Sequence, residues 1–268
     1  CREKLDHRRL FLIFLPRVPA AGRMRDQLPR RRQFGHALGE HLADRSVLGD
    51  RAAGGFPLAG VLGGRIERPL GEPDGDGPEG NVGAGTGATV AKVLGPSGAI
   101  KGGLGTASVS LSDGVVVGAI VAMNAVGGVF DHETGSMIAG PRTEHGMADP
   151  VQAMLTRDTE AGAFASTKVG GGNTIIGVVA TNATLTKPQA NRMARVAHDG
   201  LALAVRPAHT VRDGDTMFGL ATGSHPAGDL DKVYAAAVLT VSRAIVRGID
   251  AAQGLHGFPS ASDVRGGE

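Results

Sequence analysis

Apolar residues in the C-terminal two-thirds of the chain fall into short runs typical of β-strands. Residues 104–111 and 115–123 are two such runs, separated by the turn sequence Ser112-Asp113-Gly114, and together they predict a β-hairpin. Residues 175–181 have almost no polar alternation, which predicts a strand covered on both faces. Residues 217–221 predict one more short strand.

Two longer segments have helical periodicity instead. Thr186 is suited to be an N-cap, and Pro188 to be in the first turn, of a helix over residues 187–205. A second helix is predicted from residue 230 to about residue 252. Residues 127–147 show neither period and are expected to form a loop. The apolar faces of the two helices are Ala190, Met193, Ala194, Ala197 and Leu201 in the first, and Val233, Ala237, Val241, Ala244 and Ile245 in the second.

The order hairpin, strand, helix, strand, helix predicts a layered α/β fold. The chain has 43 glycines, and its hydrophobic content is 41% although its aromatic content is only 3%. We therefore expect a core of small aliphatic side chains in which the backbones approach closely.

The first 76 residues differ from the rest. They carry 13 arginines and one lysine against 10 acidic residues, and their hydrophobic periodicity is poor apart from a possible helix over 34–48. The triplet Arg30-Arg31-Arg32 is open to three interpretations: an anion or nucleic-acid patch, a solvated basic stretch, or part of a mistranslated or out-of-frame segment. Residues 71–80 (GEPDGDGPEG) are a Pro/Gly-rich predicted linker, so the chain divides into an atypical Arg-rich segment, 1–76, and a domain, 77–268.

Charge and composition exclude several classes of function. The net charge of +2 gives no general argument for binding nucleic acid. No run reaches the roughly 18 apolar residues that would span a membrane. The single cysteine, Cys1, rules out an internal disulfide and fits a cytoplasmic location.

No cofactor or metal is expected. The glycines of GAGTG, residues 83–87, do not have the G-x-G-x-x-G spacing of a dinucleotide site, and no strand precedes them. Five of the nine histidines are candidate metal ligands, but they lack metal-ligand spacing and are expected to be structural hydrogen-bonding residues. These are His132, His145, His198, His209 and His225.

Thr174 lies where the glycines 170–172 and Asn173 lead into the strand predicted at 175. It is either the start of that strand or a nucleophile that cuts the chain before itself. Breaking the Asn173-Thr174 bond would give Thr174 a free amine with a pKa of about 7.7–8.0, able to act as base for its own hydroxyl. Asp213-Gly214-Asp215 leaves two interpretations open as well: a turn, or a pair of carboxylates at a strand end.

A series of short segments, in order, resembles the L-aminopeptidase/D-esterase (DmpA-like) and β-peptidyl aminopeptidase group, peptidase family S58. The resemblance covers about residues 79–260. The segments are 81–88 (NVGAGTGA), 101–108 (KGGLGTAS), 121–125 (VAMNA), 173–182 (NTIIGVVATN), 197–202 (AHDGLA), 206–210 (RPAHT) and 213–216 (DGDT).

The resemblance implies an αββα sandwich and a hydrolase that cleaves itself into two chains. Thr174 corresponds to the nucleophile and Asn173 to the residue whose carbonyl is cleaved. Asn124 corresponds to an asparagine whose amide stabilises the oxyanion, a contribution of roughly 3–4 kcal/mol. Asp213 and Asp215 correspond to a pair beside the nucleophile; position 213 is serine in some relatives, and Asp215 would orient the freed amine.

The same resemblance implies a substrate that is a small peptide, an amino-acid amide or an ester, and a homo-oligomer of processed heterodimers. Two alternatives stay open: an acyl transferase similar to ornithine acetyltransferase, and a non-catalytic remnant or binding protein. Residues 1–76 lack the glycine-rich, aromatic pattern that the family has in this part of the chain.

Overall fold

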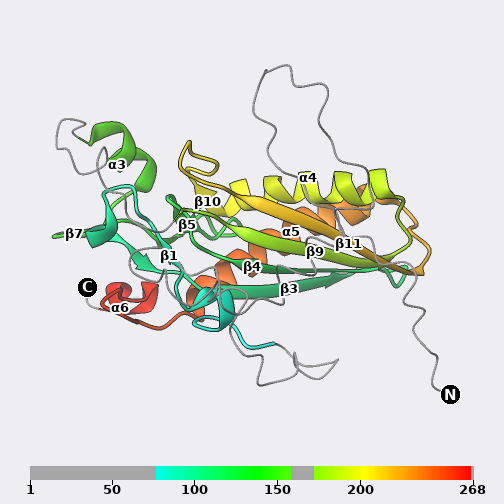
Figure 1. The fold of residues 1–268 in the computed structure, drawn as a ribbon, viewed down its shortest axis with the longest axis horizontal. Helices are drawn as coiled ribbons and strands as arrows, with labels where there is room; N and C mark the ends of the chain where they lie inside the picture. Colours follow the sequence, from blue (N-terminus) through cyan, green and yellow to red (C-terminus); the bar gives the residue numbers. More distant parts are fainter. Residues whose placement is uncertain (1–76, 158–171, 267–268) are drawn as a thin grey trace, which may run out of the picture.

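The computed structural model describes residues 77–157 and 172–266 (Figure 1). A four-stranded sheet in the order β11-β9-β4-β3 forms the centre, and three smaller sheets have the orders β10-β5-β6, β1-β2 and β7-β8. The strands of the central sheet are β3 (Leu104–Ser110), β4 (Val116–Ala122), β9 (Ile176–Ala183) and β11 (Thr216–His225). The other strands are β1 (Thr89–Val90), β2 (Ile100–Lys101), β5 (Gly128–Phe130), β6 (Met137–Ala139), β7 (Arg142–Thr143), β8 (Gly146–Met147) and β10 (Val205–Arg206). The helices are η2 (Gly83–Gly85), η3 (Pro96–Gly98), α3 (Pro150–Thr156), α4 (Lys187–Ala204), α5 (Leu230–Asp250) and α6 (Ala261–Arg265).

The predicted hairpin and strands are confirmed. β3 and β4 pair antiparallel from Leu104↔Ala122 to Ser110↔Val116, with Gly114 at φ 85° in the connecting turn. β9 lies between β4 and β11, antiparallel to the first and parallel to the second. The strand predicted at 217–221 is longer than expected and runs to His225.

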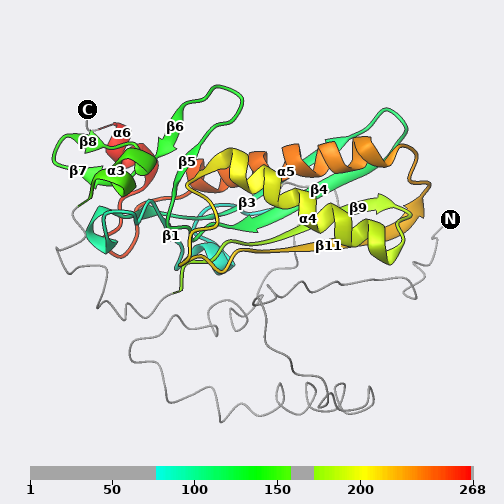
Figure 2. The same cartoon turned by 90° about the horizontal axis from the view of Figure 1, so that it is seen from above.

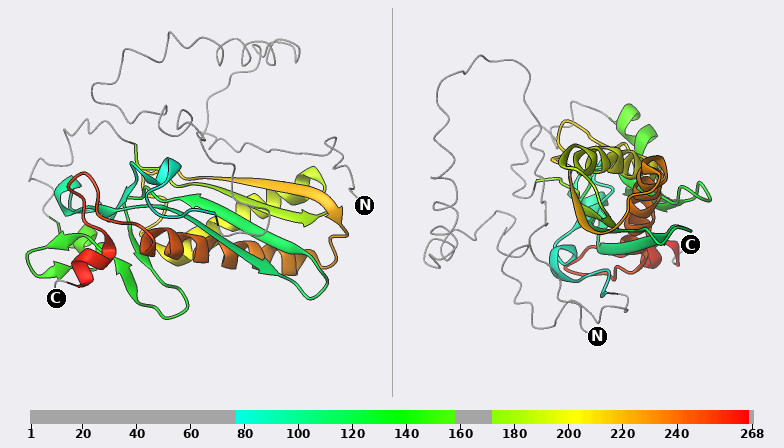
Figure 3. Two further views of the ribbon diagram at one scale, coloured as in Figure 1. Left: turned by 90° about the horizontal axis from the view of Figure 1, so that it is seen from below. Right: turned by 90° about the vertical axis from the view of Figure 1, so that its right-hand side faces the viewer.

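Both predicted long helices are present and lie side by side along one face of the sheet (Figure 2). α4 begins as expected, because Thr186 and Gln189 form a reciprocal capping box. It ends at Ala204, since Val205 is already extended and starts β10. The right-hand view in Figure 3, which looks along the strands, shows both helices on the same side of the sheet.

Small residues let the helices approach the sheet closely, as the composition predicted. A Cβ at Gly105 on β3 would collide with the Ala244 carbonyl and the Gly248 backbone of α5. A Cβ at Gly219 on β11 would collide with the Ala190 carbonyl of α4. The core consists almost wholly of Ala, Val, Ile, Leu and Met side chains.

The α/β class is confirmed, and the described residues form one helical layer and one sheet layer. The side chains on the other face of the sheet are partly open: Val116, Ile120 and Ile176 are 38%, 37% and 42% exposed. The expectation that the strand at 175–181 is covered on both faces is therefore not met by the described residues. The second half of the αββα sandwich stays a prediction.

The prediction of a loop over 127–147 is wrong, because this segment contains β5, β6, β7 and β8. Each of these strands has only two or three residues, too few to establish an alternating pattern. The last residues of the expected linker 71–80 belong to the folded domain. Gly80 pairs with Leu104, and the Glu79 carboxylate accepts two hydrogen bonds of 3.0 Å from Arg247. The Arg-rich segment, 1–76, including the possible helix over 34–48, lies outside the described residues.

None of the helices in the described part of the chain is long and apolar enough to cross a membrane.

Lys101 ties the Gly-rich turn to the sheet. Its side chain is fully buried, and Nζ donates to the carbonyl oxygens of Gly85, Ala88 and Gly102 at 2.6, 2.9 and 2.6 Å. Burial lowers the pKa of Lys101 to about 8, so the ammonium is still mostly protonated at neutral pH. A single side chain therefore satisfies three backbone acceptors.

We predict that Lys101→Met lowers the free energy of unfolding by roughly 2–4 kcal/mol, because it leaves buried carbonyls without a donor. Lys232→Met is the matched control, since Lys232 is exposed on α5, and it should change stability by less than about 0.5 kcal/mol. Urea denaturation of both variants, each in a Thr174→Ala chain, measures the difference. Equal midpoints would show that the Lys101 bonds contribute nothing.

Candidate active site

The ends of two neighbouring strands hold the Asn173-Thr174 peptide from both sides. The Thr174 amide donates to the Asn124 carbonyl at 2.9 Å, two residues beyond β4. The Gly214 amide donates to the Asn173 carbonyl at 2.8 Å, two residues before β11. The Asn173-Thr174 bond thus continues the line of β9 beyond the end of the strand. It lies between the segment that follows β4 and the segment that precedes β11.

The Thr174 hydroxyl is directed at the carbonyl that precedes it. Oγ1 donates to the Asn173 oxygen at 2.6 Å, so this carbonyl accepts two hydrogen bonds, one from Thr174 and one from Gly214. The absence of a side chain at Gly214 leaves room for the hydroxyl, because a Cβ there would lie 2.9 Å from Thr174 Oγ1. The bond is partly buried and polarised, and a hydroxyl lies next to it.

Asn124 lies beside the bond, as the resemblance predicted, but its amide points elsewhere. Nδ2 donates to the Gly172 carbonyl at 2.8 Å and not to the Asn173 carbonyl. Oδ1 accepts from the Thr89 amide at 3.2 Å and from Lys92 Nζ at 2.8 Å. The donor expected to stabilise an oxyanion is therefore bonded to the chain just before the Asn173-Thr174 bond.

Lys92 is one residue at this site that sequence reasoning missed. Its Nζ contacts both oxygens of Asn124, including, at 3.3 Å, the carbonyl oxygen that also accepts from the Thr174 amide. Burial lowers the pKa of Lys92 to about 7, and the charge of Asp213 opposes that shift only in part. The sequence did contain a signal, since Lys92 is the one charged residue in the apolar run 90–94.

Asp213 holds the loop before β11 in place. Its Oδ1 accepts from the Val126 amide at 3.2 Å, and its Oδ2 accepts from the amide and hydroxyl of Thr210 at 3.0 and 2.6 Å. The residue is only 7% exposed. The Asp213 amide also donates to the Thr210 carbonyl at 3.0 Å, so Asp213 closes a turn and lies three residues before β11. Both sequence interpretations therefore stay open.

Asp215 faces the other side of the candidate nucleophile. Its Oδ1 accepts from the Ile175 amide at 2.9 Å, and its Oδ2 lies 2.8 Å from His209 Nδ1. The structure thus brings together all the residues predicted for the site: Asn124, Asn173, Thr174, Asp213 and Asp215.

The histidines have separate partners. His132 is bonded to Ser242, His145 to Glu144, and His225 to the Pro226 carbonyl, whereas the rings of His198 and His209 lie 5.0 Å apart. Within residues 77–157 and 172–266, no group of three or more His, Cys, Asp or Glu side chains is arranged to hold a metal ion. Residues 83–87 contain the short helix η2, which packs on β3, in place of the strand–turn–helix of a dinucleotide site.

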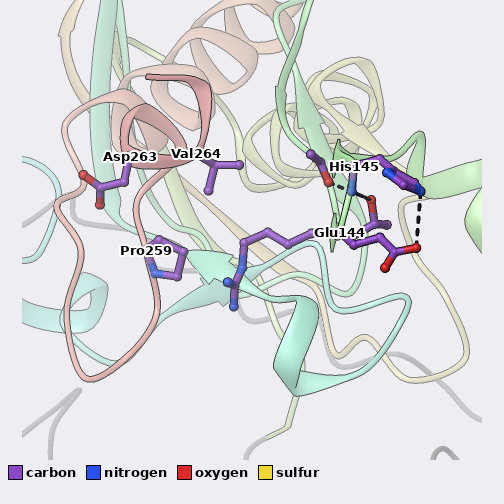
Figure 4. Close-up of a pocket in the computed structure, with 8 residues that line it drawn as sticks. Glu144, His145, Pro259, Asp263 and Val264 are labelled. Carbon is purple, nitrogen blue, oxygen red and sulfur yellow. Dashed lines mark hydrogen bonds and ion pairs between the residues drawn. The ribbon is translucent and has the colours of Figure 1, made fainter. Parts of the chain in front are cut away.

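A pocket of about 540 Å³ lies between the β7–β8 hairpin and α6 (Figure 4). It is separate from the candidate active site, because none of the five site residues lines it. The side chains of Glu144 and His145 at its rim are 84% and 86% exposed. Its lining consists of Arg142, Thr143, Glu144, His145, Gly146, Pro259, Asp263 and Val264.

The family model of Peptidase family S58 matches residues 65–262, and the chain therefore belongs to this family. The match begins within the Arg-rich segment, upstream of residue 77. An uncharacterised aminopeptidase of Mycobacterium leprae is 39% identical over 200 residues, which are 68% of this chain and 51% of that protein. A 6-aminohexanoate-oligomer endohydrolase of an Agromyces species is 31% identical over 157 residues, 55% of this chain and 41% of that protein.

Among solved structures, the L-aminopeptidase D-Ala-esterase/amidase of Ochrobactrum anthropi aligns with a TM-score of 0.45 and 27% identity, over 69% of this chain and 50% of that one. The chain spans about half the length of the curated relatives that it matches.

We predict that Asp213→Ala lowers the free energy of unfolding by roughly 2–3 kcal/mol, since the buried Val126 amide and the Thr210 amide lose their acceptor. Asp199→Ala, on the exposed side of α4, is the matched control and should be nearly neutral. Both are compared by urea denaturation in a Thr174→Ala chain. If the two variants unfold at the same urea concentration, Asp213 does not anchor the loop.

Proposed function

We propose that this chain is a self-processing hydrolase that cuts its own Asn173-Thr174 bond and then uses Thr174 to open small peptides, amino-acid amides or esters. The observation that carries the proposal is the setting of that bond. Its amide and carbonyl are held by Asn124 and Gly214, and the Thr174 hydroxyl lies against the carbonyl. The names of the relatives, aminopeptidases and an oligoamide hydrolase, support the same class of reaction.

In the first stage, Thr174 Oγ attacks the Asn173 carbonyl carbon and gives up its proton to a base. The negative charge develops on the Asn173 oxygen, which the Gly214 amide already contacts. The C–N bond then breaks, the Thr174 nitrogen takes a proton, and Asn173 is left as an ester on Oγ. Water opens this ester and gives an Asn173 carboxylate and a Thr174 with a free amine and hydroxyl.

The first cut needs a base other than the Thr174 amine, because that amine does not exist before the bond breaks. Lys92 is the candidate, since its Nζ and the Thr174 nitrogen share one acceptor, the Asn124 carbonyl oxygen. With a pKa of about 7, roughly half of Lys92 is neutral at pH 7 and able to accept a proton.

In the second stage, the freed Thr174 amine takes the proton of its own hydroxyl, and Oγ attacks the substrate carbonyl carbon. The amine or alcohol of the substrate leaves with that proton, and water then opens the acyl-enzyme to release the acid and restore the Thr174 hydroxyl. Departure of the new chain end would remove Gly172 from the Asn124 amide. That amide then becomes available to the carbonyl of a substrate. On this mechanism, the Asn124 amide binds the Gly172 carbonyl before the cut and stabilises the oxyanion of the substrate after it.

An acyl transferase would share the first stage and differ in the acceptor of the acyl group. A ping-pong assay with an acetyl donor and an amine acceptor separates the two activities. The similarity to proteins named as aminopeptidases favours water as the acceptor. Assembly as a homo-oligomer of processed heterodimers stays a prediction.

We predict that Thr174→Ala gives an uncut chain with no activity on amino-acid p-nitroanilides, since it removes the nucleophile. Thr174→Ser keeps a hydroxyl and should still be cut. Thr222→Ala on β11 is a control with the same change of side chain at an exposed position outside the site. Intact mass and release of p-nitroaniline are the measurements, and activity that persists in Thr174→Ala would contradict the assignment of the nucleophile.

We predict that the rate of self-cleavage rises with pH through about 7, because the neutral form of Lys92 increases over that range. Lys92→Arg keeps the positive charge but cannot lose its proton at these pH values, and should slow cleavage at least about 100-fold. Lys232→Arg is the matched control. A Lys92→Arg chain that is cut at the wild-type rate from pH 6 to pH 8 would exclude Lys92 as the base.

A further inference from the structure

Asp215 is a buried carboxylate whose two oxygens have different partners. Its side chain is only 3% exposed, so an ionised Asp215 depends on the donors around it. Oδ1 accepts from the Ile175 amide, directly after the candidate nucleophile, and Oδ2 lies 2.8 Å from His209 Nδ1. The Ile175 amide therefore holds one oxygen of this carboxylate, and His209 contacts the other.

His209 contacts Asp215 from a backbone conformation with a positive φ. Its φ is 54°, a left-handed value that histidine adopts more often than most residues other than glycine. Its ring lies 5.0 Å from the ring of His198 on α4, and its side chain is 37% exposed.

We propose that His209 is a positioning residue for the reaction at Thr174: by donating from Nδ1 to Asp215 Oδ2, it keeps Asp215 Oδ1 on the Ile175 amide. This inference rests on the proposed self-cleavage. It adds a contact on the C-terminal side of Thr174 to the two contacts, from Asn124 and Gly214, on its N-terminal side.

Both sides are needed to fix the direction of the Thr174 side chain. Asn124 and Gly214 hold the peptide that precedes Thr174, and Asp215 holds the peptide that follows it. Without the His209 donor, Asp215 would have to turn to find another partner, and the Ile175 amide would lose its acceptor. The hydroxyl would then spend less time at the Asn173 carbonyl.

Two substitutions separate the donor from the backbone conformation. His209→Gly adopts the positive φ without strain and removes the donor. His209→Asn also tolerates this φ, and its Nδ2 can take the place of the imidazole Nδ1. His256→Gly is the matched control, because His256 has a φ of 53° and is exposed in a turn between Leu255 and Phe258.

The experiment follows the fraction of cut chain over time by intact mass, with the full chain and each variant at the same pH. We expect His209→Gly to slow cleavage about 10–100-fold, His209→Asn to recover most of that loss, and His256→Gly to cut at the wild-type rate. In an Asp215→Asn chain, the further change His209→Gly should have little effect, because the two act through one contact.

Cleavage of His209→Gly at the wild-type rate would overturn the inference and leave the proposed function intact. Equal slowing in His209→Gly and His209→Asn would overturn the role as a donor. If the wild-type chain itself is never cut, the proposed function fails, and the inference that rests on it fails too. Urea denaturation of each variant in a Thr174→Ala chain checks that the folds are equally stable.

Discussion

The register of β9 between its two neighbours is the constraint on which the candidate site depends. Ala122 and Thr216 both pair with Ile176, and extending the two ladders by two residues brings Asn124 and Gly214 to Thr174. A shift of one residue in either pairing would turn every side chain of β9 to the other face of the sheet. Val179 and Ala183, fully buried in the core, prevent that shift. The position of the Asn173-Thr174 bond is thus fixed by the packing of a strand that begins two residues later.

Around that bond, the polar groups form a connected set in which each residue has a distinct task. Asn124 links Lys92 to the segment before Thr174, Asp213 anchors the loop that supplies the Gly214 amide, and Asp215 holds the amide that follows Thr174. The low pKa of Lys92 is a direct result of this packing, since burial disfavours its charge. The same packing that forms the core therefore provides a side chain able to exchange a proton near neutral pH.

Much of the fold could be predicted from local patterns. The hairpin of β3 and β4, the N-cap at Thr186 and both long helices follow from alternation, turn residues and helical spacing. The parallel pairing of β9 with β11 could not be, because it joins segments that are far apart in sequence. The strands β5 to β8 were also missed, since two or three residues carry no period.

The candidate site was predicted in part, through the resemblance more than through chemistry. From local sequence, Thr174 could be only the start of a strand and the two aspartates only part of a turn. Their order in the chain, together with the other matching segments, pointed to a site. The partners of each side chain depend on tertiary contacts, so the bond of Asn124 to Gly172 and the approach of Lys92 were not foreseeable. His209 had been interpreted as a structural residue, and its contact with Asp215 appears only in three dimensions.

On the proposed mechanism, the chain breaks at the Asn173-Thr174 bond by its own chemistry. N-terminal sequencing of the purified wild-type chain, incubated alone and free of other proteases, tests it most directly. Self-cleavage predicts a new chain that begins Thr174-Ile175-Ile176-Gly177 and increases with time at a rate independent of protein concentration. A chain that keeps only its original N-terminus, or a new end at any other residue, would contradict the claim.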